Sequence, residues 1–127
     1  MQSIFVRFLR SSLLSLAVVS GSAHSTESTF DLAIVDGRVA KEKRLIKVNK
    51  GDTVRLRLTS NLAGDVHLHA YRLQTKVSSD KPSELTFRAH ATGKFRFEWH
   101  ETKQQGKAPA EGGHHAEPLA TLEVRPN

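Results

Sequence analysis

The chain contains no cysteine, and its single methionine is Met1. Disulfide bonds are therefore excluded, so stability has to come from a packed core. Thiolate-ligated blue copper, iron–sulfur clusters and cysteine-type zinc sites are excluded for the same reason. Any metal site in this chain would have to be built from nitrogen and oxygen donors.

Long hydrophobic runs are also missing. The main apolar run, residues 13–19, is well short of the ~20 residues that a membrane-spanning helix needs. Arg7 and Arg10 precede it and small residues follow it, which is the pattern of a secretory signal peptide. We therefore predict a signal peptide over residues 1–25, and the alternative is an uncleaved membrane anchor.

Cleavage after Ala23 or after Ser25 would satisfy the small-residue rule at the cleavage site. Residues 26–127 would then form one domain without a transmembrane segment, in the periplasm or otherwise exported. A chain of this length has room for one core.

Aromatic residues make up only 6% of the chain, and the formal net charge is +6. Much of the basic excess alternates with apolar residues, as Arg55 and Arg57 do between Val54, Leu56 and Leu58. Such spacing is typical of the solvated outer face of a sheet. A basic stripe with interleaved aromatics is absent, so we expect no nucleic-acid partner.

No window of twelve or more residues has helical periodicity, and after residue 25 apolar residues recur with a period of two. This pattern predicts about seven short strands separated by turns, and an irregular crossover over residues 74–83. The fold class predicted is all-β, an antiparallel β-sandwich with Greek-key connections. The predicted strands cover residues 30–34, 45–48, 53–59, 66–73, 85–90, 95–99 and 119–124.

Five of the seven histidines fall in three short clusters. Imidazole is the commonest protein ligand for zinc and copper. His24 and His90 stand apart, and we expect His90 to face solvent. The clustered histidines are His67 and His69, His100, and His114 with His115.

Each cluster has a metal-binding interpretation and an alternative as surface residues. His67 and His69 are two apart, so on a strand they point to the same face and can chelate one ion. His100 ends a predicted strand, where a side chain can enter a pocket at the sandwich edge. His114 and His115 follow two glycines in a long loop, and we expect one of the two to ligate.

The order of these parts resembles the cupredoxin fold family, in particular small bacterial periplasmic cupredoxin-like proteins. The resemblance covers about residues 30–126 and rests on IKVNKGDTVRLRLTSN, DVHLHAY, ATGKFRFEWH and HHAEPLATLEVRP. It implies a cupredoxin-like sandwich in which His67 takes the place of the first copper ligand. The other family ligands would fall between His100 and His114–His115.

The family's cysteine and axial methionine are missing, and His100 stands near the place of the cysteine. The resemblance therefore implies a histidine-only site, most suited to Cu(II) with Zn(II) as second candidate, rather than a blue-copper electron carrier. Carboxylates were expected to supply an oxygen ligand or to orient an imidazole, and the candidates are Glu101, Glu111 and Glu117.

The function predicted is a periplasmic metal-binding protein for copper binding, sequestration or delivery, with the metal ion and a periplasmic protein as its partners. The alternative is a metal-free cupredoxin-like interaction module. We do not expect an enzyme, because the sequence has no convincing nucleophile–histidine–acid arrangement, phosphate-binding glycine loop or hydrolytic carboxylate pair. A redox activity of histidine-bound copper is the remaining enzymatic alternative.

Overall fold

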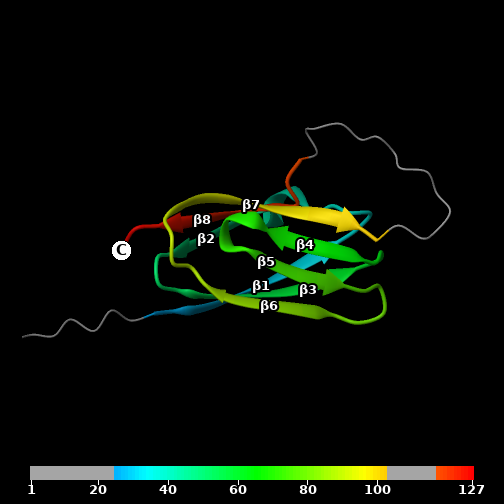
Figure 1. The fold of residues 1–127 in the computed structure, drawn as a ribbon, viewed down its shortest axis with the longest axis horizontal. Coiled ribbons are helices and arrows are strands. Elements are labelled where there is room, and N and C mark those ends of the chain that lie inside the picture. The colour runs from blue at the N-terminus through cyan, green and yellow to red at the C-terminus, as the bar shows by residue number, and fades with distance from the viewer. Residues whose placement is uncertain (1–24, 103–116) are drawn as a thin grey trace, which may run out of the picture.

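Alternating apolar and polar residues form the strands of a computed structural model that describes residues 25–102 and 117–127 (Figure 1). Neither of the two three-residue helices in these ranges has the length to cross a membrane. The predicted signal peptide and its Ala23 cleavage site lie outside the described residues. The described elements are β1 (Glu27–Ile34), η1 (Lys41–Lys43), β2 (Leu45–Asn49), β3 (Thr53–Ser60), β4 (Gly64–Leu68), η2 (His69–Tyr71), β5 (Leu73–Val77), β6 (Ser83–Arg88), β7 (Gly93–Glu101) and β8 (Ala120–Arg125).

The strands form two sheets, one with the order β1-β3-β6 and one with the order β2-β8-β7-β4-β5. The predicted all-β sandwich is thereby confirmed. The sheets are mixed rather than purely antiparallel, because β1 runs parallel to β3 and β2 runs parallel to β8. Neither pair is consecutive in the chain, so no tight hairpin forces its strands into opposite directions.

The structure has eight strands where about seven were predicted, because the stretch 66–73 is not one strand. It is divided into β4 and β5 by the 3-10 turn η2, whose C-terminal cap Arg72 has a left-handed backbone with φ 53°. Part of the predicted irregular crossover 74–83 is instead strand β5. In β5 the buried Val77 and the half-buried Leu73 and Thr75 alternate with exposed polar residues.

The core lies between the two sheets and is made by every second residue of each strand. In β3, Val54, Leu56 and Leu58 are fully buried, as their spacing predicted. Burying one such aliphatic side chain contributes about 1.5–3 kcal/mol to folding. The largest fully buried side chains are Phe97, Ile34, Ile46, Leu56, Leu58, Leu68, Leu122, Val54 and Val66.

Asp36 and Gly37 form a tight turn after β1. Both residues have positive φ, 50° and 74°, and Val35 and Arg38 exchange two backbone hydrogen bonds of 2.8 and 3.0 Å. A Cβ added to Gly37 would lie 2.9 Å from Cδ1 of Trp99, so the indole of that residue packs directly on the turn.

Trp99 also packs on Gly64 at the start of β4, where an added Cβ would lie 2.5 Å from Cζ2 of the indole. A side chain there would also meet the carbonyl oxygen of His100 at 2.6 Å. The absence of a side chain at residue 64 therefore allows β4 and the end of β7 to approach closely. This approach brings together the two strands that carry most of the candidate site.

Candidate metal centre

Histidines from three elements meet on the outer face of the five-stranded sheet. Val66 and Leu68 of β4 point into the core, so His67 between them points outward. In β7, Phe97 is buried and the exposed His100 lies on the outer face. β4 and β7 are antiparallel neighbours, as Figure 1 shows, and their register places His67 opposite Glu98.

The register also makes His67 and His100 diagonal cross-strand neighbours, which is close enough for long side chains to touch. Their ring centroids are 4.5 Å apart, and those of His67 and His69 are 5.5 Å apart. One ring nitrogen of each of the three histidines lies within 4.8 Å of the others. The structure therefore brings together three of the five histidines that the sequence singled out.

His69 belongs to the cluster although it does not lie on a strand, which the sequence did not predict. The strand ends at Leu68, and His69 begins η2. The turn is held by a 2.9 Å hydrogen bond from the backbone N–H of Arg72 to the carbonyl of His69. Ala70 is exposed in this turn.

Tyr71 anchors η2 to the core. Its ring packs edge-on against Phe87 and Phe95 at centroid distances of 5.4 and 5.2 Å. Its hydroxyl donates a 3.1 Å hydrogen bond to the carbonyl of Ala91. The turn that carries His69 is thus fixed to the interior by its own third residue.

Glu98 completes the cluster, and the sequence reasoning missed it. Its Oε2 lies 2.8 Å from Nε2 of His69 and 3.6 Å from Nε2 of His100. The hydrogen bond from His69 is the main reason why the pKa of the Glu98 carboxyl lies below its usual value. A signal was available, because Glu98 and His100 are two apart on a strand and therefore share a face.

Three other carboxylates were predicted from the sequence to ligate the ion or to orient an imidazole. Two of them have other surroundings, and the third lies outside the described residues. Glu117 forms a 2.7 Å ion pair with Arg44, which holds the pKa of its carboxyl below the usual value. Glu101 is exposed at the end of β7, opposite Gly64. Glu111 lies outside the described residues.

The cluster is open to solvent. The side chains of His69 and His100 are 63% and 54% exposed, and His67 is half-buried. The expected loop-lined pocket is not formed by the described residues, since the histidines lie on a sheet face. An ion bound here could therefore enter and leave without a large rearrangement of the described residues.

The remaining histidines take no described part in this cluster. His90 is exposed, as predicted, and its ring lies 4.4 Å from that of Tyr71. His114 and His115 lie outside the described residues, as does His24, so ligation by the loop stays a prediction.

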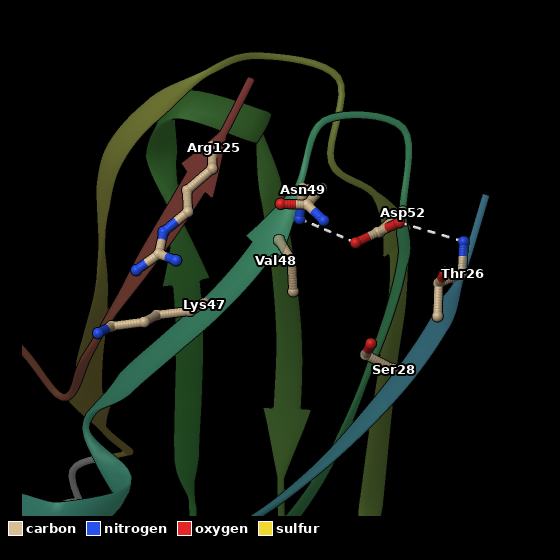
Figure 2. A pocket seen from close by; sticks show the side chains of 7 residues that line it. All are labelled: Thr26, Ser28, Lys47, Val48, Asn49, Asp52 and Arg125. Carbon is tan, nitrogen blue, oxygen red and sulfur yellow. Dashed lines mark hydrogen bonds between the residues drawn. The ribbon is translucent and has the colours of Figure 1, made fainter. Parts of the chain in front are cut away.

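A polar hollow of about 320 Å³ lies between the edge strands β1 and β2 (Figure 2). The carboxylate of Asp52 accepts hydrogen bonds there from the backbone N–H groups of Thr26 and Asn49, at 3.1 and 2.8 Å. None of its lining residues is a histidine, and it shares no residue with the cluster on β4 and β7. Its lining residues are Thr26, Ser28, Lys47, Val48, Asn49, Asp52 and Arg125.

Comparisons with known proteins match this chain by structure and not by sequence. No protein-family model and no curated protein matches the sequence. A chain of a heme-copper terminal oxidase dimer matches with a TM-score of 0.57 and 16% identity, over 80% of this chain and 65% of that one. A copper binding protein in its apo form matches with a TM-score of 0.55 and 9% identity, over 80% and 91%.

The periplasmic domain of subunit II of cytochrome oxidase from Bradyrhizobium japonicum is a third match, with a TM-score of 0.52 and 13% identity over 78% and 83% of the two chains. The chain spans less than two thirds of some of these proteins, for example 42% of a copper nitrite reductase from Nitrosomonas europaea. At these identities the likeness concerns the fold. The described residues therefore have the cupredoxin-like fold that the sequence motifs indicated.

Proposed function

We propose that this chain is an exported, periplasmic protein that binds one Cu(II) ion through His67, His69 and His100. The observation that carries the proposal is the approach of one ring nitrogen from each histidine to within 4.8 Å of the others.

The donor set favours a divalent ion of intermediate hardness. Imidazole suits both copper and zinc, whereas soft monovalent copper prefers the sulfur ligands that this chain lacks. Copper(II) binds nitrogen sites more tightly than zinc(II) does, which places zinc second. Structural neighbours that are named as copper proteins support the same choice.

The geometry of the cluster fits an ion after a small adjustment. Nitrogens that each lie ~2.0 Å from one ion are at most about 4 Å apart. Three nitrogens that share one ion are about 3–3.5 Å apart on average, so separations of up to 4.8 Å need to close by up to about 2 Å, which rotation of the histidine side chains allows. His114 or His115, or a water molecule, would supply a further ligand.

The exposure of the cluster supports sequestration or delivery as the task, and binding rather than catalysis. Ligands of a partner protein can approach His69 and His100 directly from solvent. Rapid electron transfer in this fold depends on a copper–thiolate unit, which this chain cannot build. Since metal binding to imidazole competes with protons, uptake should weaken as the solution is acidified.

The proposal is tested by titrating the purified chain with Cu(II) and recording its EPR spectrum. We expect one ion per chain, with nitrogen couplings and no intense blue colour. A variant with His67→Ala and His100→Ala should lose this site. His90→Ala, which removes an exposed histidine outside the cluster, is the matched control and should bind like the original chain.

An unchanged titration in the double variant, or no uptake at micromolar concentration, would contradict copper binding at this cluster. The alternative, a metal-free interaction module, would then be favoured. Under that alternative, capture of a periplasmic partner would be insensitive to chelators and to the double variant alike.

A further inference from the structure

We infer that Glu98 positions His69 so that the ring binds the ion through Nδ1, and that its negative charge makes the site prefer divalent over monovalent copper. This inference rests on the proposed function and extends it to a residue and to an oxidation state. In it Glu98 is a positioning residue, since it acts on the ion through a neighbouring ring.

The hydrogen bond between Glu98 and His69 determines which ring nitrogen is free. An ionised carboxylate can only accept, so the proton of the 2.8 Å contact belongs to Nε2 of His69. A neutral imidazole that carries its proton on Nε2 has its lone pair on Nδ1. Carboxylates that hold metal-binding histidines in this way commonly change metal affinity by ten- to a hundred-fold.

The framework that holds Glu98 is independent of any ion. The residue lies within β7, directly opposite His67 of β4, and its neighbour Phe97 is fully buried. Its carboxylate therefore starts from a fixed strand position, while His69 starts from a short turn. The carboxylate is thus in place before an ion binds, and it can orient the ring of His69 through their 2.8 Å contact.

The charge of Glu98 acts in addition to its hydrogen bond. A carboxylate adjacent to the site attracts a doubly charged ion more strongly than a singly charged one, by Coulomb's law. The three histidines add no negative charge to the site, and the other carboxylate on this face of β4, Asp65, lies opposite His100. We therefore expect Glu98 to raise affinity for Cu(II) more than affinity for Cu(I).

Two substitutions separate the hydrogen bond from the charge. In Glu98→Gln the amide oxygen can still accept from Nε2 of His69, but the charge is gone. In Glu98→Ala both are gone. Glu123→Gln is the matched control, because Glu123 lies on the same sheet face, on neighbouring β8, and pairs with Arg125 rather than with a histidine.

The first measurement is long-range ¹H–¹⁵N NMR of the Zn(II)-loaded chain, which identifies the coordinating nitrogen. We expect His69 to be bound through Nδ1 in the original chain, in Glu98→Gln and in Glu123→Gln. In Glu98→Ala this single state should be lost. Coordination of His69 through Nε2 in the original chain would overturn the inference.

The second measurement compares Cu(II) and Cu(I) affinities by competition with chelators. Glu98→Gln should weaken Cu(II) binding ten- to a hundred-fold and Cu(I) binding less, and the reduction potential should rise by about 59 mV for each tenfold change in their ratio. If Glu98→Gln, Glu123→Gln and the original chain bind copper with equal affinity, the role of Glu98 is refuted. The proposal of a copper site at the three histidines would not be affected. Absence of copper uptake by the original chain would instead refute the proposed function, and this inference with it.

Discussion

The carboxylate of Asp52 is buried, and its two oxygens accept backbone N–H groups from two different parts of the chain. One donor is Thr26, just before β1, and the other is Asn49, at the end of β2. Figure 2 shows the side chain between these strands. A single residue thus connects the edges of the two sheets.

Replacement of this residue by its amide tests that connection. Asp52→Asn turns one acceptor into an NH₂ group that faces a backbone N–H, so a part-buried donor loses its partner. We expect the free energy of unfolding to fall by about 1–3 kcal/mol, measured by urea denaturation followed by circular dichroism. Asp31→Asn removes the same charge from an exposed position on β1 and should change stability by less than about 0.5 kcal/mol.

Single residues of the cluster were predictable to different degrees. His67 and His100 could be placed near each other because strand periodicity and the cupredoxin resemblance agreed. Glu98 was overlooked because its importance depends on the register that places it opposite His67, and register is a property of strand pairing. His114 and His115 lie outside the described residues, so their role stays a prediction.

At the scale of the element, the packing of β4 against β7 depends on the first residue of β4. Gly64 has no room for a side chain, because the indole of Trp99 and the carbonyl of His100 occupy the place of a Cβ. A side chain at residue 64 would therefore push the end of β7 away from β4. The positions of the histidines depend on this contact.

Gly64→Ala should disturb both stability and metal binding. The added methyl group must displace the indole or the β7 backbone, at a cost of about 1–3 kcal/mol in the free energy of unfolding. Copper affinity should fall as well, since His100 shifts with its carbonyl. Ala63→Ser, at the exposed neighbouring residue, is the control, and equal stability of the two variants would contradict the packing argument.

The elements themselves were largely visible in the sequence, and their pairing was not. Seven apolar runs marked most of the strands, since alternation reports burial of one face. The break at η2 was missed because Val66, Leu68 and Ala70 alternate as in one continuous strand, and Leu73, which is out of phase with them, was included in it. The parallel partners of β1 and β2 were missed because they are set by long-range crossovers between the sheets, which leave no local signal.

For the whole molecule, several surface carboxylates have pKa values below their usual range. Hydrogen bonds from Arg44 to Glu117 and from Arg125 to Glu123 lower the pKa values of these two carboxyls. At Glu98 the main cause is the hydrogen bond from His69. In each case the folded chain holds its proton less tightly than the unfolded chain, whose glutamates titrate near pH 4.3. Folding is therefore stabilised by these groups above that pH.

The free energy of unfolding should decline as the pH falls through about 5 and then through the lowered pKa values of these groups. The decline should be smaller in 1 M salt, because the pairs are exposed and screened. Urea denaturation at pH 7, 5, 4 and 3 measures it. Stability that is constant or rises over this range would show that the pairs do not matter.

The packing of Trp99 gives the molecule a built-in optical reporter. It is the chain's single tryptophan, and it lies beneath β7 next to His100, which is on the opposite face. Bound Cu(II) has an unpaired electron and should quench the fluorescence of this indole, whereas Zn(II), with its filled d shell, should leave it bright. The fluorescence of this one partly buried residue would then reveal which ion the outer face holds.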